Sequence, residues 1–184
     1  MSRAFVKEDN SGTPPIIPPR AALPPATSNY VTPRGLALLR TELADLEGER
    51  SRTEANHSDE ADRTRQLTIL NGRLGALLER LASAKVVDPG SQLPDQVRFG
   101  ATVTLRTRGE GSPGLERRFT IVGVDEASAA EGRVAFVAPI ARAVTGVGLG
   151  QTVTLRTGRG EEVVEVVAIA YGEAKDQPEA RAQE

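Results

Sequence analysis

The sequence predicts an α+β protein in which an antiparallel helical hairpin is followed by a small β-rich domain. In the first half, two rows of leucines recur at alternating spacings of three and four residues, which is typical of two helices packed side by side. After residue 89 this spacing gives way to short alternating segments rich in valine and threonine, which is typical of strands. We therefore expect a disordered proline-rich leader over residues 1–29, a coiled-coil arm over 30–88, the β-rich domain over 89–171 and a disordered tail over 172–184.

The hairpin is predicted to begin at Thr32 and Pro33, because threonine caps helices well and a proline at the first helical position removes no needed N–H group. Its two rows consist of Leu36, Leu39, Leu43 and Leu46, then Leu67, Leu70, Leu74, Leu77 and Leu81. Facing residues of an antiparallel pair have a constant sum of residue numbers, and four successive leucine pairs give 116 or 117, which centres the turn near residue 58. Toward the turn, Arg50 and Thr53 take the seam positions, so we expect a firm base and a looser tip.

Alternation and β-branched residues predict the strands of the second half. The predicted strands cover residues 97–105, 116–124, 133–137, 152–156 and 163–169, and a short helix opened by proline covers 139–144. Four phenylalanines, two tyrosines and no tryptophan leave leucine, valine, isoleucine and alanine to build the core.

Composition excludes several classes of function. Without cysteine the chain has no disulfides and no thiolate metal site, and no apolar run approaches the roughly 18 residues that a membrane span needs. Residues 91–171 carry nine basic and nine acidic side chains, so no basic stripe predicts autonomous binding to duplex DNA. We expect a cytoplasmic monomer that acts on a protein partner.

Three segments carry recognisable motifs: residues 30–36 (YVTPRGL), the end of the hairpin at 86–88, and the block 138–143 (APIARA) with the glycines that follow it. Together they resemble the Gre family of bacterial transcript-cleavage and elongation factors. The resemblance covers roughly residues 30–170, and its most specific part is the APIARA block.

The resemblance implies a C-terminal domain like that of FK506-binding proteins, docked on core RNA polymerase beside its secondary channel. The implied contact residues are Ala138, Pro139, Ile140 and Arg142. It also implies that the arm enters the channel toward the 3′ end of the nascent RNA, where acidic residues at the tip help to hold a catalytic Mg²⁺. The polymerase then hydrolyses the RNA, so the chain is itself no enzyme and has no cofactor of its own.

Laid on the tip, the family pattern falls on Asn56, Asp59, Glu60 and Asp62, of which Asp59 and Glu60 are the candidates to share Mg²⁺ with the polymerase. Asn56 occupies a position where the family has an acidic residue, and Arg63 occupies one where an aromatic residue is usual. The arm is also expected to be several turns shorter than the usual arm of the Gre family. A structural interpretation of the same residues is that Ser58 or Asp59 caps the second helix and that its dipole favours acidic side chains in the first turn.

Several alternatives remain open at this point. The factor can assist RNA cleavage, or it can occupy the channel without cleaving. Ile140 can be a core residue with Val144 instead of a contact, and His57 is expected to be solvated. A peptidyl-prolyl isomerase shares the expected fold, but its active site is a pocket lined by aromatic side chains. The aromatic residues that this domain offers are expected to be needed for its core, and they are Phe99, Phe119, Phe136 and Tyr171. A coiled-coil adaptor leaves the APIARA block without a purpose.

Overall fold

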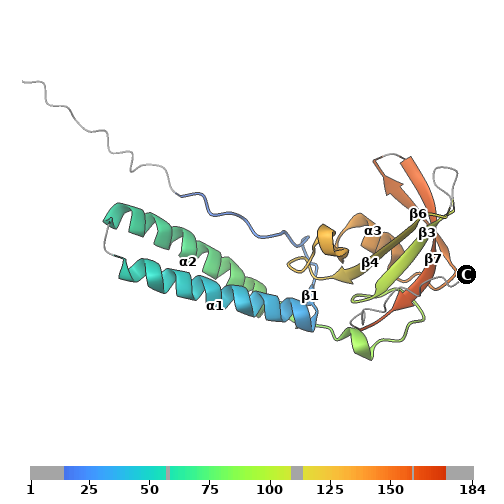
Figure 1. Cartoon of the computed structure of the whole chain (residues 1–184), viewed down its shortest axis with the longest axis horizontal. Coiled ribbons are helices and arrows are strands. Elements are labelled where there is room, and N and C mark those ends of the chain that lie inside the picture. Colours follow the sequence, from blue (N-terminus) through green and yellow to red (C-terminus); the bar gives the residue numbers. More distant parts are fainter. Residues whose placement is uncertain (1–14, 57–58, 109–113, 159, 173–184) are drawn as a thin grey trace, which may run out of the picture.

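The computed structural model describes residues 15–56, 59–108, 114–158 and 160–172, and in it a two-helix arm extends from a domain built on a β-sheet (Figure 1). The α+β fold class predicted from the sequence is confirmed. The expected boundaries of the four segments remain predictions, and residues 1–14 and 173–184 lie outside the described residues.

The arm consists of α1 (Pro33–Ala55) and α2 (Glu60–Ala82), which pack against each other along the predicted leucine rows. Leu39, Leu46, Leu70, Leu74 and Leu77 form one buried cluster. Leu36, Leu43 and Leu81 pack against this cluster, so all four predicted pairs belong to it. No helix in the described part of the chain is long and apolar enough to cross a membrane.

The base of the arm is closed by a short parallel ladder that the sequence did not reveal. Strand β1 (Asn29–Val31) pairs with β2 (Ala84–Val86), and the N–H of Val87 donates to the carbonyl of Val31 at 2.9 Å. Asn29 is 3% exposed and donates to the carbonyl of Arg80 at 2.8 Å. Strands of three residues are too short to show an alternating pattern, so only tertiary contacts specify them.

Residues 15–28 contain no helix or strand, and they lie along the arm (Figure 1). The expected disorder of this leader stays a prediction, but one of its residues, Arg20, contacts two carboxylates. Its guanidinium donates to Glu42 at 2.8 and 3.0 Å and to Asp125 at 2.8 Å.

The β-rich domain contains a five-stranded sheet with the order β5-β4-β3-β7-β6. Its strands are β3 (Thr102–Thr107), β4 (Glu116–Val122), β5 (Arg133–Ala135), β6 (Thr152–Thr157) and β7 (Gly160–Ala170). Neighbours are antiparallel except for β4 and β5, which are parallel. Two 3-10 turns, η1 (Pro89–Ser91) and η2 (Ala129–Glu131), lie in the connections.

All five predicted strands are present, but the first begins five residues later than expected. Gly100 has a φ of +87°, which breaks the extended chain before β3. A Cβ atom at this position would lie 2.7 Å from Cγ of Pro89, so the close approach of the arm–domain connection also requires glycine.

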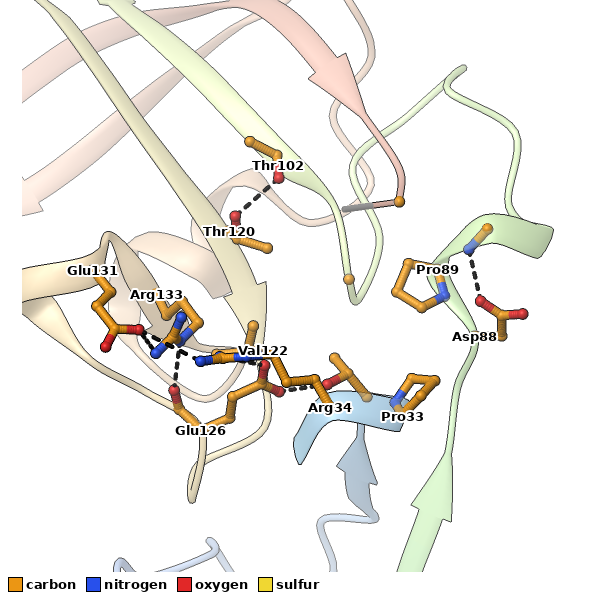
Figure 2. Close-up of a pocket in the computed structure, with 14 residues that line it drawn as sticks. Pro33, Arg34, Asp88, Pro89, Thr102, Thr120, Val122, Glu126, Glu131 and Arg133 are labelled. Atoms are coloured by element: carbon orange, nitrogen blue, oxygen red, sulfur yellow. Dashed lines mark hydrogen bonds and ion pairs between the residues drawn. The ribbon is translucent and has the colours of Figure 1, made fainter. Parts of the chain in front are cut away.

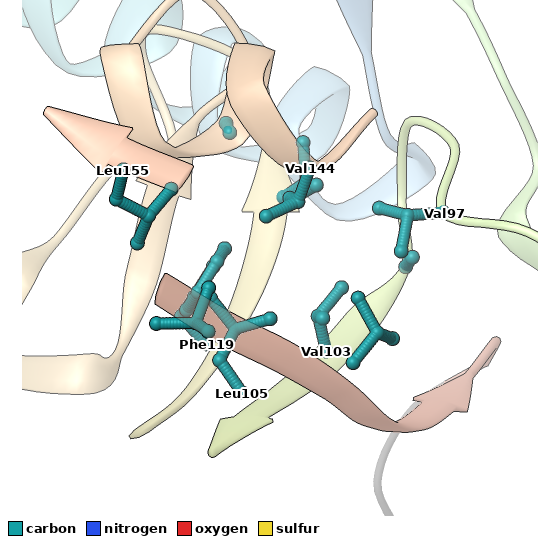
Figure 3. Close-up of a cluster of buried hydrophobic side chains, with 11 residues drawn as sticks. Val97, Val103, Leu105, Phe119, Val144 and Leu155 are labelled. Atoms are coloured by element: carbon teal, nitrogen blue, oxygen red, sulfur yellow. The ribbon is translucent and has the colours of Figure 1, made fainter. Parts of the chain in front are cut away.

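One face of the sheet is covered by α3 (Pro139–Val144), the helix that the sequence predicted with these bounds. The core between them is aliphatic apart from Phe119 (Figure 3). It consists of Val97, Ala101, Val103, Leu105, Phe119, Ile121, Ala141, Val144, Leu155, Val164 and Val166.

Candidate functional site

The predicted contact block forms α3 and the residue before it. Ala141 and Val144 are fully buried and face the core, whereas Pro139 and Arg142 are exposed. The N–H of Ala138 donates to the carbonyl of Ala135 at 2.8 Å, which fixes the chain at the start of the helix. The helix therefore presents an apolar ring and a cation to solvent from a rigid support.

Ile140 has a different position. It is half-buried and packs against the core cluster, so the core interpretation describes it better than the contact interpretation does. Sequence reasoning did not single out Leu149, which is 61% exposed in the loop that follows α3. Isoleucine and leucine are both apolar and aliphatic, so the sequence did not reveal that Leu149 is more exposed than Ile140.

The tip of the arm uses Asp59 as a helix cap. Its Oδ1 atom accepts hydrogen bonds from the N–H groups of Ala61 at 2.9 Å and Asp62 at 3.2 Å. These bonds satisfy two of the N–H groups that the first turn of α2 leaves without a helical partner. The prediction that Asp59 caps the second helix is therefore confirmed, and the cap uses its Oδ1 atom.

The other acidic residues of the tip face solvent. The side chain of Glu60 is 89% exposed and lies 3.9 Å from Arg63, and Asp62 is exposed in the first turn of α2. Asn56 ends α1, and its N–H donates to the carbonyl of Thr53 at 3.3 Å. His57 and Ser58 lie outside the described residues.

No group of three or more histidine, aspartate or glutamate residues in the described part of the chain is arranged to hold a metal ion. The described carboxylates of the tip therefore need further ligands from another molecule to hold Mg²⁺, which prefers six oxygen ligands.

A buried carboxylate lies where the arm meets the domain, and sequence reasoning missed it. Glu126 is 5% exposed and accepts hydrogen bonds from the hydroxyl of Thr32 and from Arg34 at 3.2 Å. The Thr32 hydroxyl also accepts from the N–H of Gly35 at 2.9 Å, so one threonine caps α1 and joins it to the domain. Because these partners are 92 and 94 residues from Glu126, no local sequence pattern signals the contact.

Beside this contact is a cavity of about 560 Å³, whose walls are the start of α1, η1, the start of β3 and the end of β4 (Figure 2). Arg34 lies 3.6 Å from Glu131, which also pairs with Arg133, and Thr102 is 2.9 Å from Thr120. Both arginines of the lining are paired with its two glutamates, and Asp88 adds a third acid, so no unpaired cation is left in this cavity to bind an anion.

The aromatic side chains serve packing. Tyr30, Phe99 and Phe136 form a triangle with ring centroids 5.7 to 5.8 Å apart, which joins β1 to the domain. Phe119 is buried, and burial raises the pKa of Tyr171, whose hydroxyl donates to the carbonyl of Gln96 at 2.7 Å. The aromatic pocket of an isomerase therefore has no support in the structure.

A helical arm carried by a β-rich domain defines a protein that presents the turn between two helices far from its body. Residues 91–171 match the family described as transcription elongation factor, GreA/GreB, C-terminal. The chain is 34% identical to transcription elongation factor GreB of Neisseria meningitidis, over 79% of this chain and 95% of the relative. It is also 34% identical to transcription elongation factor GreA of Brucella canis, over 77% and 96%. The chain belongs to the GreA/GreB family of transcription elongation factors.

A solved structure is also similar to this chain, the transcription elongation factor GreA/GreB from Nitrosomonas europaea. It has 22% sequence identity and a TM-score of 0.38, and the match covers 77% of this chain and 98% of that one. The family assignment depends on the sequence relatives.

Proposed function

We propose that this chain regulates transcription elongation by docking on RNA polymerase through its β-rich domain and placing its arm in the secondary channel. The observation that carries the proposal is the arm itself. Its two helices have 23 residues each, which corresponds to about 35 Å at a rise of about 1.5 Å per residue. A projection of that length can occupy a channel while the domain stays outside it.

The proposed docking surface comprises Ala138, Pro139 and Arg142 of the α3 region, with Leu149 in the loop that follows. Pro139 is rigid and exposed, and Leu149 adds apolar area, which is the composition of a small protein–protein anchor. Arg142 adds a planar cation suited to a carboxylate on the partner. Ile140 supports this surface from below through its contact with the core.

Stimulation of transcript cleavage is the second candidate function, and the exposure of Glu60 and Asp62 favours it. Carboxylates suit Mg²⁺, and a metal-bound water is a better nucleophile because its pKa is lowered. Asp59 is a weaker candidate than its neighbours, because capping already occupies one of its oxygens.

Binding to core RNA polymerase tests the first function. We expect Pro139→Asp and Arg142→Glu each to weaken binding roughly tenfold or more, which corresponds to about 1.4 kcal/mol. Arg118→Glu is the matched charge control: Arg118 is exposed and adjacent in β4 to the core residue Phe119, so it points away from the face that α3 covers. If folded Pro139→Asp and Arg142→Glu proteins bind like wild type, the docking surface is wrong.

Cleavage of a stalled, backtracked elongation complex separates the two functions. Loss of stimulated cleavage in a Glu60→Gln, Asp62→Asn double variant that still binds polymerase would establish the second function. If the wild-type protein binds polymerase without stimulating cleavage, the second function is excluded and occupation of the channel remains as its function.

A further inference from the structure

The proline-rich segment before the arm makes a specific contact with both parts of the molecule. The Arg20 guanidinium bridges Glu42 of α1 and Asp125 of the connection after β4. Its side chain is 17% exposed, so water screens these pairs less than it screens a surface pair. One side chain of the leader thus joins the arm to the domain.

A second arginine completes this cluster. Arg80 of α2 lies 3.2 Å from the other oxygen of Asp125 and donates to the backbone carbonyl of Ala21. Asp125 and Arg80 are 11% and 10% exposed. The leader and α2 therefore meet the domain at Asp125, and α1 joins the cluster through Glu42 and Arg20. A planar guanidinium is suited to reach two acids at once.

A glycine on α2 lets the leader approach the arm. A Cβ atom at Gly72 would lie 2.3 Å from Cδ1 of Ile17, whereas nothing lies within 4 Å of a Cβ atom at Gly75. Most residues of the leader are exposed, and an open pocket of about 330 Å³ is lined by Pro18, Pro19, Arg20, Glu42, Arg73 and Asp125. Few apolar contacts hold the leader, so the ion pairs are the main attachment.

We propose that residues 15–28 form a strap whose Arg20 clamp fixes the angle between the helical arm and the β-rich domain. Prolines at 18, 19, 24 and 25 restrict the backbone before docking, which lowers the entropy lost when the segment binds. The Glu126 contacts join the start of α1 to the domain, and the strap adds a brace farther along α1 at Glu42. Two attachment points along one helix limit its rotation more than one point does.

A fixed angle matters for a factor that docks with one part and inserts the other, and this consequence rests on the proposed function. The angle between arm and domain is a property of the free protein, so it does not depend on the proposed function. An experiment on the free protein therefore distinguishes failure of the strap from failure of polymerase docking.

The absence of cysteine allows spin labels to be placed at will in the full chain. With labels at exposed positions Ala44→Cys on α1 and Thr154→Cys on β6, the distance distribution reports the angle between arm and domain. We expect one narrow distribution for the otherwise unchanged chain and a wider one for Arg20→Ala. Arg20→Lys should lie between them, because one ammonium group cannot replace a fork that reaches two carboxylates.

Arg40→Ala is the control for this series, since Arg40 is exposed on α1 and its loss removes the same charge. It should leave the distribution unchanged. A distribution for folded Arg20→Ala that matches wild type in centre and width would overturn the strap.

A second pair of variants tests the docking of the leader without changing any charge. With labels at Ile16→Cys and Ala44→Cys, Gly72→Ala should displace or broaden the leader–arm distance, because the new methyl group would collide with Ile17. Gly75→Ala makes the same substitution one turn away in open space and should have no effect. Identical distributions for the two variants would show that the contact between Ile17 and Gly72 does not position the leader.

Discussion

The base and the tip of the arm have the same helical repeat but opposite kinds of seam. At the base, Leu39 and Leu77 are 2% and 0% exposed, and the β1–β2 ladder and the contacts of Glu126 with the start of α1 also lie at this end of the arm. Near the tip, the seam positions are taken by Arg50, Thr53 and Arg63, all half-buried. Burial at the base supplies the stability that lets the tip carry polar residues for another purpose.

The same difference separates the glycines of the arm. Gly35 lies in the first turn of α1, where Glu126 and Thr32 leave no room for a side chain. Gly75 lies on the exposed surface of α2 with open space around it. A glycine at the base is required by a contact, whereas this one only lowers helix stability.

The largest expected effect comes from truncating the buried seam. Leu77→Ala should lower the free energy of unfolding by about 2 to 5 kcal/mol, the range for emptied core positions. Leu67→Ala should cost roughly half as much, since Leu67 is only half-buried and loses less apolar contact. Urea unfolding measured by circular dichroism gives both values, and equal losses would contradict the distinction between base and tip.

The next effect contrasts the two glycines. In Gly35→Ala the new Cβ atom would lie 2.8 Å from Oε2 of Glu126, and disturbing this buried carboxylate should cost about 1 to 3 kcal/mol. Gly75→Ala should stabilise the protein by up to about 1 kcal/mol, through helix propensity alone. Thermal unfolding of the two variants should show shifts of opposite sign, and a common sign would mean that the Glu126 contact contributes little.

The repeat explains why the hairpin was predictable. Burial recurs along each helix at the spacing of the leucines, so Leu39 and Leu77 could be paired by number before any contact was known. The start of α3 at Pro139 was predictable for a similar reason, because a proline suits the first turn of a helix.

Contacts between distant segments were not predictable in this way. Glu126, Asp125 and Arg20 lie in connections without a repeat, and their charges resemble those of ordinary surface residues. The β1–β2 ladder has only three residues per strand. The sequence therefore predicted the elements well and the arm–domain junction poorly, because the junction depends on tertiary placement of single side chains.

At the tip, the helix cap should have a smaller effect than either base substitution. Asp59→Ala removes the acceptor for the N–H groups of Ala61 and Asp62 and should cost about 1 kcal/mol. Asp59→Asn keeps an oxygen acceptor and should cost only about 0.3 kcal/mol, because it loses only the interaction of the negative charge with the helix dipole. Hydrogen exchange of the first turn of α2 measures the local opening, and equal protection in the alanine variant and wild type would mean that the cap does not stabilise this turn.

The smallest expected effect tests whether the polar tip is a cost to stability. Arg50→Leu would continue the apolar seam toward Leu67 and should contribute about 1 kcal/mol of burial. It also removes the ion pair with Glu54, which has a separation of 3.5 Å and contributes about 0.3 to 0.5 kcal/mol. The balance is a gain of about 0.5 kcal/mol, whereas Arg50→Ala should lose a few tenths of a kcal/mol. If urea unfolding shows that Arg50→Leu is the less stable of the two, the tip is not an interrupted leucine seam, and its polar residues must pack in a way that stabilises the arm themselves.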